Sequence, residues 1–277
     1  MSLLHLNFES EYLHFNTDVN IIMPDRPKNI TPEQFYLSGE KYKVLYLLHG
    51  TYGDYTDWIR KSNIEVYAAE RNLVVVMPSA GNSYYSNWST MMGINVRDYL
   101  IKELMPLING WLPVSDKRED TFIAGLSMGG EGTLKYAVNY PDKFAAAAVL
   151  SMYSRDYAAI PPEKADRRTL DRYNAVGGFE NFINSYENTR ELLLRHKDDG
   201  TLPRLMFTIG EDDFLWEGYC EFKKWAVENG IKAEFYETPG YTHEWRFWDL
   251  EIQRALDFFG IEKFDPVNFW DLKKDKK

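Results

Sequence analysis

The chain has 277 residues, of which 44% are hydrophobic and 27% charged, a composition typical of a globular protein with a sizeable buried core. Its 42 acidic and 32 basic side chains give a net charge of −10, which argues against nucleic acids and membranes as partners because both attract clustered positive charge. The single cysteine, Cys220, excludes an internal disulfide and a thiolate metal cluster, and with no secretory signal at the N-terminus we expect a cytoplasmic location.

The chain begins with short alternating stretches. Residues 4–8, 12–15 and 19–23 alternate apolar and polar side chains ahead of Pro24. A period of two is typical of half-buried strands, so we expect an antiparallel portion here.

A different rhythm follows, in which compact apolar runs alternate with helical stretches. The runs lie at residues 44–48, 73–77, 121–124, 144–150, 205–209 and 233–236, and the main helical stretches at 96–108, 131–139, 216–229 and 244–259. This alternation predicts a single α/β domain over residues 1–277, with a mostly parallel central sheet and helices on both faces. In such folds the ligand crevice lies at the carboxyl ends of the strands.

Two segments depart from this rhythm. Residues 153–203 separate two core strands and contain a Pro-Pro pair, a charged run and a further helical stretch. A segment this long predicts an insertion above the sheet, either a lid or cap or a purely structural excursion. Residues 265–277 end in Lys-Lys-Asp-Lys-Lys and are expected to form a flexible tail.

The clearest chemical signal is Gly125-Leu126-Ser127-Met128-Gly129, which fits the pattern G-x-S-x-G. A predicted strand precedes it and a predicted helix follows it, which is the context that a nucleophile elbow requires. The glycines leave room for a strained serine backbone, and the helix start offers N–H groups to a developing oxyanion. The pattern therefore predicts Ser127 as a catalytic nucleophile.

A serine hydroxyl needs a general base, and the chain contains five histidines. His5 and His14 lie in the N-terminal region, His196 lies in a charged helical stretch, and His49 ends an early strand. His243 follows the last predicted strand, downstream of the serine and on the crevice side. We therefore predict that His243 is the base.

A carboxylate must orient the imidazole and balance its charge. The strand at residues 205–209 leads into Gly210-Glu211-Asp212-Asp213, and any of these three acids could reach the histidine. Asp213 leaves room for a turn that points its carboxylate back over the sheet, so we favour Asp213 over Asp212. The chain order Ser, Asp, His is that of α/β-hydrolases.

Backbone amides are expected to hold the oxyanion. The N–H of Met128, the residue after the nucleophile, is one predicted donor. An earlier strand leads into His49-Gly50-Thr51-Tyr52, where we expect the Thr51 N–H to be the second donor, with Tyr52 as the near alternative. His49 then orders this loop rather than acting as a base.

Aromatic side chains make up 16% of the chain and gather in the loops after the predicted strands. Those that we assign to substrate binding are Tyr52, Tyr85, Trp88, Phe214 and Trp245. Flat rings around a crevice suit aromatic or sugar-bearing esters and leave little room for a long acyl chain. The alternative is that these rings pack loops onto the sheet or form a contact in a homo-oligomer.

Together these motifs resemble the esterase D and feruloyl-esterase branch of the α/β-hydrolases, especially bacterial tributyrin esterases. The resemblance covers nearly the whole chain and rests on the blocks at residues 19–24, 47–50, 125–130, 210–215 and 240–245. It implies a triad of Ser127, Asp213 and His243, with no metal and no organic cofactor. Residues 153–203 depart from the family pattern, which leaves the acyl and alcohol specificity open.

We therefore predict a serine carboxylic-ester hydrolase that cleaves a small-molecule ester through an acyl-enzyme. Expected substrates are short-chain acyl esters, feruloyl-type aromatic esters or acetylated sugars. Hydrolysis of S-formylglutathione and acyl transfer are alternatives that use the same machinery. A non-catalytic binding module is a third alternative, which an intact triad disfavours.

Overall fold

The structure is a computed structural model that describes residues 1–27, 30–88 and 93–263. Its strands are β1 (Ser2–Glu9), β2 (Asn16–Met23), β3 (Val44–Leu48), β4 (Val74–Pro78), β5 (Asn87–Trp88), β6 (Ile94–Asn95), β7 (Thr121–Leu126), β8 (Ala146–Leu150), β9 (Arg204–Gly210) and β10 (Glu234–Thr238).

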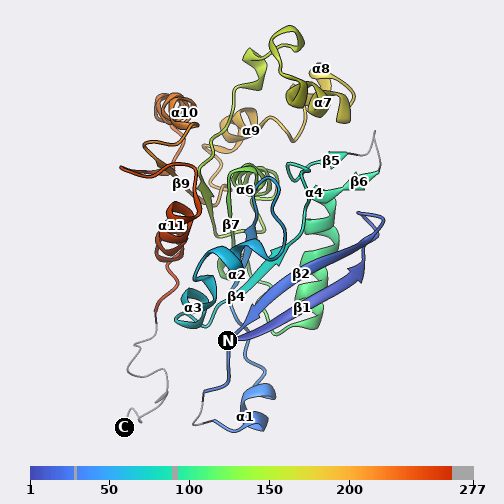
Figure 1. Cartoon of the computed structure of the whole chain (residues 1–277), viewed down its shortest axis with the longest axis vertical. Coiled ribbons are helices and arrows are strands. Elements are labelled where there is room, and N and C mark those ends of the chain that lie inside the picture. The colour runs from blue at the N-terminus through green and yellow to red at the C-terminus, as the bar shows by residue number, and fades with distance from the viewer. Residues whose placement is uncertain (28–29, 89–92, 264–277) are drawn as a thin grey trace.

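The central sheet has the strand order β1-β2-β4-β3-β7-β8-β9-β10 (Figure 1). β2 pairs antiparallel with both β1 and β4, and the remaining neighbours in this sheet are parallel. The predicted mostly parallel sheet with an antiparallel N-terminal portion is therefore confirmed.

Helices cover both faces of this sheet. The α-helices of the described residues are α1 (Pro32–Tyr36), α2 (Asp57–Lys61), α3 (Ile64–Ala69), α4 (Val96–Asp98), α5 (Met105–Trp111), α6 (Met128–Asn139), α7 (Arg167–Ala175), α8 (Phe179–Ile183), α9 (Thr189–His196), α10 (Trp216–Glu228) and α11 (Trp245–Phe258). Helices α5, α6 and α10 contribute to the core on one face, and α3 and α11 to the core on the other.

The central strand β3 shows why these strands are continuous apolar runs in the sequence. Val44, Tyr46 and Leu48 pack into one core, and Leu45 and Leu47 pack into the other. All five side chains are buried. Because successive residues of a strand point to opposite faces, a strand covered on both faces needs apolar side chains at every position.

Two predicted elements differ in the structure. Residues 12–15 are not a strand but the turn between β1 and β2, closed by the Ser10 carbonyl, which accepts a hydrogen bond from the His14 N–H at 2.9 Å. The helix predicted at 96–108 is interrupted by a π-helical segment, Tyr99–Leu104. Pro106 follows this segment and has no N–H to give to the carbonyl four residues earlier, so a regular α-helical bond is missing there.

Residues 153–203, which we call the cap, lie between β8 and β9 and carry α7, α8 and α9. In Figure 1 α7 and α8 lie at one end of the molecule, beyond α6. Tyr157, Tyr173 and Phe182 form a small core inside the cap, and Leu193 of α9 joins the core that α6 shares with the sheet. The cap is therefore packed onto the sheet, and its movement as a lid stays a prediction. The tail predicted at 265–277 lies outside the described residues.

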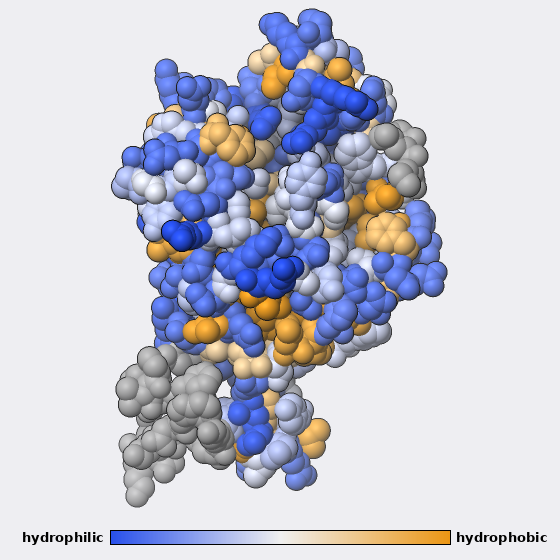
Figure 2. All heavy atoms as spheres, viewed as in Figure 1, coloured by the Kyte–Doolittle hydropathy of each residue, from blue (hydrophilic) through white to orange (hydrophobic). Residues whose placement is uncertain are grey.

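The surface agrees with the acidic, polar composition. Figure 2 shows a face that is mostly hydrophilic, with apolar side chains in small patches between polar ones. Within the described residues, no helix is both long enough and apolar enough to cross a membrane.

The start of α6 packs unusually closely against the ends of two strands. Ser127 joins β7 to α6 with φ of 53°, in the left-handed region that ordinary residues avoid. A Cβ on Gly129 would lie 2.5 Å from the carbonyl oxygen of Leu48, and a Cβ on Gly125 would lie 2.4 Å from the carbonyl oxygen of Gly129. Only glycine at both positions lets the helix begin directly behind the serine.

We predict that Gly129→Ala lowers the free energy of unfolding by about 1–3 kcal/mol, because the new methyl group meets backbone atoms that cannot move aside. Gly110→Ala is the matched control, since a Cβ at this exposed position of α5 meets nothing within 4 Å. This control should be neutral or stabilising by up to about 1 kcal/mol. Urea unfolding measures both; equal stability of Gly129→Ala and wild type would contradict the packing argument.

Candidate active site

The structure brings the three predicted triad residues into one chain of hydrogen bonds. Nε2 of His243 lies 2.9 Å from Oγ of Ser127, and Nδ1 of His243 lies 2.8 Å from Oδ2 of Asp213. The three residues come from loops or turns after β7, β9 and β10, at the carboxyl edge of the sheet. Residues far apart in the chain therefore meet where parallel strands end together.

Hydrogen-bonding rules fix the proton positions in this chain. A carboxylate only accepts, so the Nδ1 of His243 donates to Asp213. Nε2 is then the unprotonated nitrogen, and it accepts the hydrogen of the Ser127 hydroxyl. This is the tautomer that allows a histidine to remove a proton from serine.

Packing holds both partners of Ser127 in place. The Asp213 side chain is fully buried, and its Oδ1 accepts a hydrogen bond from the Leu215 N–H at 2.9 Å. The His243 ring lies against two aromatic rings, with centroids 4.6 Å from Phe214 and 5.0 Å from Trp248. The imidazole is therefore oriented by contacts on its faces and edges as well as by Asp213.

The structure also distinguishes the candidate acids. The side chain of Asp212 is exposed, and its N–H donates to the carbonyl of Tyr241 at 3.0 Å. Gly210 allows these two loops to approach, because a Cβ there would lie 2.2 Å from the same carbonyl oxygen. Of the acids predicted at this strand end, Asp213 is the one that contacts His243.

The loop after β3 is ordered by His49, as predicted. Its Nε2 accepts from the Ala80 N–H at 2.9 Å, so Nδ1 carries the hydrogen that is donated to the Gly50 carbonyl at 2.7 Å. Burial lowers the pKa of His49 and keeps the ring neutral. The Tyr52 N–H donates to Oδ1 of Asn82 at 2.8 Å, which leaves it unsuited to an oxyanion.

Thr51 and Met128, the predicted oxyanion donors, both line the cavity beside Ser127. Within the part of the chain that the structure describes, neither backbone N–H has a hydrogen-bond partner. The N–H groups of Thr51, after β3, and of Met128, at the start of α6, are therefore available to a ligand, and their role as an oxyanion hole stays a prediction.

The triad opens onto a cavity of about 750 Å³. On the sheet side it is lined by residues of the loop after β3, α2 and α11, and on the other side by the cap residues Arg155, Asp166, Arg168, Thr169 and Arg172. The volume suits a small molecule. Among the described residues, no group of three or more His, Cys, Asp or Glu side chains could hold a metal ion.

Three of the five aromatic residues predicted to bind substrate line this cavity, and two do not. Tyr52, Phe214 and Trp245 lie in its wall, with Tyr52 and Phe214 largely exposed. The prediction for Tyr85 is wrong, because this residue is 1% exposed and its hydroxyl donates to the His49 carbonyl at 3.0 Å. The prediction for Trp88 is also wrong, since this residue lines a separate, smaller apolar pocket.

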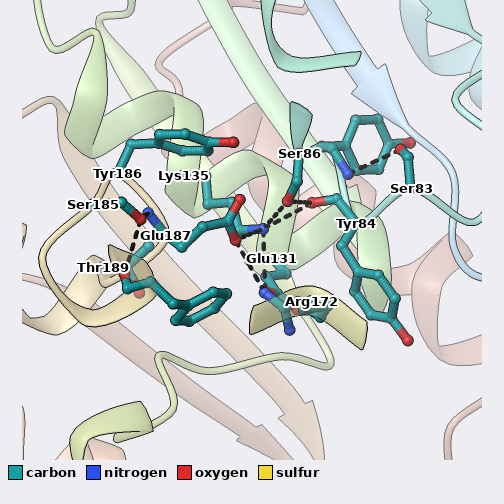
Figure 3. A network of polar contacts seen from close by, with 12 residues as sticks. Ser83, Tyr84, Ser86, Glu131, Lys135, Arg172, Ser185, Tyr186, Glu187 and Thr189 are labelled. Carbon is teal, nitrogen blue, oxygen red and sulfur yellow. Dashed lines mark hydrogen bonds and ion pairs between the residues drawn. The ribbon is translucent and has the colours of Figure 1, made fainter. Parts of the chain in front are cut away.

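Sequence reasoning missed a buried cluster of charges between α6 and the cap, which Figure 3 shows. Nζ of Lys135 lies 2.7 Å from Glu187 and 3.3 Å from Glu131, and donates to Oγ of Ser86 at 2.8 Å. Arg172 of α7 donates to Glu131, and to Glu187 at 3.1 Å. We call these two acids and two bases the ion network. The signal in the sequence was Glu131 and Lys135, one helical turn apart in the helix that follows the predicted nucleophile.

The ion network is electrically balanced and almost dry. Lys135 and Glu187 are 1% exposed, and Glu131 and Arg172 are 6% exposed. Burial raises the pKa of Glu131, but the charges of Arg172 and Lys135 outweigh it and lower this pKa to about 2. Glu131 is therefore ionised in the folded protein at neutral pH, and the two acids and two bases of the network depend on each other for charge compensation.

Comparisons with known proteins agree with this fold and site. The Esterase family model, described as "Putative esterase", matches residues 23–259. An acetyl esterase of Caldicellulosiruptor saccharolyticus is 30% identical over 266 residues, which cover 93% of this chain and 98% of that protein.

Two solved structures from Staphylococcus aureus are also similar. The fluorophosphonate-binding serine hydrolase FphF is 28% identical, with a TM-score of 0.78 over 93% of this chain and 98% of that one. The S-formylglutathione hydrolase FrmB is 29% identical, with a TM-score of 0.77 over 94% of this chain and 99% of that one.

The fold, the site and these matches define a serine carboxylic-ester hydrolase with the α/β-hydrolase fold. The chain belongs to the Esterase family, whose model covers most of its length. The resemblance to an esterase branch of the α/β-hydrolases is thereby confirmed.

We predict that Asp213→Asn lowers kcat by about 10⁴-fold with little change in KM, because an amide at this position favours the wrong histidine tautomer. The neighbouring Asp212→Asn is the control and should stay within a few-fold of wild type, since Asp212 is exposed and bonds only through its backbone. Steady-state kinetics on nitrophenyl acetate compares them, and a larger loss in Asp212→Asn would refute the assignment of the acid.

A second prediction concerns the ion network. Lys135→Met should cost about 3–5 kcal/mol of unfolding free energy, because it leaves buried carboxylates without enough positive charge. Adding Glu187→Gln removes one of these carboxylates, so the double variant should lose about 0.5–3 kcal/mol less than the sum of the single variants.

The matched control for this cycle is the exposed pair of Arg195 and Glu191 on α9. Removing that pair should change stability by less than about 1 kcal/mol. Denaturant unfolding of all variants supplies the numbers. Strict additivity of Lys135→Met and Glu187→Gln would show that the two buried charges do not compensate each other.

Proposed function

We propose that Ser127 is the nucleophile of an esterase that hydrolyses small esters through an acyl-enzyme. The observation that carries the proposal is the unbroken chain of hydrogen bonds from Ser127 through His243 to Asp213, beside two unpaired backbone N–H groups and a cavity. This arrangement supports the proposal, because it offers a candidate residue for each role that acyl transfer to serine requires.

The proposed reaction has two halves. Oγ of Ser127 attacks the ester carbonyl while Nε2 of His243 takes the hydroxyl proton, and Asp213 stabilises the resulting imidazolium. The amides of Thr51 and Met128 hold the tetrahedral oxyanion, and His243 then protonates the departing alcohol. A water molecule, deprotonated by the same histidine, releases the acid and restores Ser127.

We propose short acyl groups, such as acetyl, as the preferred acyl part. The similar protein from C. saccharolyticus is an acetyl esterase, and this supports a small acyl group. Tyr52, Phe214 and Trp245 in the cavity wall also suit a flat aromatic or sugar-bearing group. A cytoplasmic location remains a prediction from the single cysteine.

A second candidate is hydrolysis of the thioester S-formylglutathione. It is favoured by the similarity to FrmB, which is an S-formylglutathione hydrolase. A formyl group is the smallest acyl group, and the same triad and amides would cleave a thioester.

One substrate series tests the proposal. Wild type and Ser127→Ala are compared on nitrophenyl acetate, butyrate and octanoate, methyl ferulate, acetylated xylan and S-formylglutathione. We expect Ser127→Ala to lose about 10⁶-fold in kcat while keeping its fold. In wild type, kcat/KM should peak at four carbons or fewer and fall by octanoate.

Two results would contradict the proposal. Hydrolysis by purified Ser127→Ala within tenfold of wild type would exclude Ser127 as the nucleophile. A steady rise in kcat/KM through octanoate, driven by about 0.8 kcal/mol for each buried methylene, would show a long acyl channel instead. A much higher kcat/KM for S-formylglutathione than for any ester would favour the second candidate.

A further inference from the structure

The cap side of the cavity carries three arginines, and their surroundings differ. Arg172 donates to Glu131 and Glu187, so its charge is neutralised inside the ion network. Arg155 and Arg168 also line the cavity, but neither forms an ion pair within the described residues. The cavity therefore has two arginines whose charge is not neutralised by a direct partner.

Arg155 is the more constrained of the two. It is half-buried, and its Nε is a buried atom without a hydrogen-bond partner among the described residues. The guanidinium carbon lies 5.7 Å from the centre of the Tyr153 ring. The neighbouring Asp156 does not serve it, because that carboxylate faces Arg190 at 3.7 Å. A buried, unpaired donor on a cation is unfavourable unless a ligand supplies the acceptor.

The acids that act on these arginines already have other partners. Glu131 interacts electrostatically with Arg155, but it is ion-paired with Arg172 and Lys135. Asp166 caps α7, accepting from the Thr169 N–H at 2.8 Å, and that hydrogen bond, ahead of the weaker effect of the Arg155 and Arg168 charges, lowers the pKa of Asp166. One carboxylate against two guanidinium groups leaves the cap wall with a net positive charge.

The opposite wall carries no cation without a direct partner, and it adds one carboxylate, Glu244, that forms no ion pair among the described residues. Asp57 pairs with Lys61 at 2.8 Å, and both line the cavity. Glu244 accepts hydrogen bonds from the backbone and hydroxyl of Thr242 in its own loop. Positive charge that is free to meet a ligand is therefore concentrated on the cap.

We propose that Arg155 and Arg168 bind a carboxylate carried by the substrate, so that the enzyme prefers acidic esters over neutral ones. The inference rests on the proposed function, because the bound ester must reach Ser127 in the same cavity. Guanidinium groups suit this role, since their N–H donors pair with carboxylate oxygens in a fixed planar geometry. The carboxylate can belong to the acyl part or to the alcohol part of the ester.

Two pairs of substrates, which we call the acyl-side arm and the alcohol-side arm of the test, distinguish these two possibilities. Monoethyl succinate carries the carboxylate on the acyl side, and ethyl succinamate is its uncharged amide counterpart. O-acetylglycolate carries it on the alcohol side, and O-acetylglycolamide is the uncharged counterpart. Titration of the released acid measures the hydrolysis of each ester. The quantity compared is the ratio of kcat/KM for the charged ester to kcat/KM for its uncharged amide counterpart.

For wild type we expect this ratio to be above about ten in one of the two arms, because one charge-assisted hydrogen bond to a ligand changes kcat/KM by about that factor. Arg155→Gln should lower the ratio about tenfold, Arg168→Gln by less because it is exposed, and Arg155→Lys should keep part of it. Arg167→Gln is the matched control, because Arg167 is the neighbour of Arg168 on α7 and does not line the cavity. Added salt should lower the wild-type ratio.

Wild-type ratios of one or less in both arms would overturn the inference, as would a ratio that Arg155→Gln leaves unchanged. Hydrolysis of the neutral esters in either case would leave the proposed function standing. If wild type hydrolyses none of the four esters and no nitrophenyl acetate either, the proposed function itself is overturned.

Discussion

The close approach of α6 to the ends of β3 and β7 is the constraint on which the site depends. With no side chain at Gly125 or Gly129, the helix begins against the Leu48 carbonyl and the chain must reverse within one residue. The chain reverses its direction at Ser127, which has a φ of 53°, and the Ser127 hydroxyl lies within hydrogen-bond distance of His243. Strain at one residue is tolerated because the sheet and the helix on either side fix the backbone.

The same helix also holds the cap. Glu131 and Lys135 of α6 join Arg172 and Glu187 of the cap in the ion network, so one helix carries the proposed nucleophile at its start and the cap contact one turn later.

The contribution of this ion network to stability depends on pH. The pKa of Glu131 is depressed to about 2 in the folded state, whereas an unfolded glutamate titrates near pH 4.3. Its contribution to stability is therefore present above about pH 4.3 and is lost as the pH falls toward 2.

Sequence reasoning found the sheet and the triad because both follow local rules. Buried strands are continuous apolar runs, and Ser127, Asp213 and His243 each follow a strand that ends at the same edge. It failed for Tyr85, since Tyr84 and Tyr85 both have φ of 55° and the chain turns the second ring inward. The ion network was also missed, because charged residues on a helix are usually solvated and their partners come from the distant cap.

The central claim is that Ser127 alone is activated for attack on an acyl group. A fluorophosphonate probe tests it directly, because an activated serine oxygen displaces fluoride from phosphorus and keeps the phosphonyl group. Peptide mapping by mass spectrometry should place one adduct on Ser127 in wild type and none in Ser127→Ala. An adduct on another residue, or equal labelling of Ser127→Ala, would contradict the account.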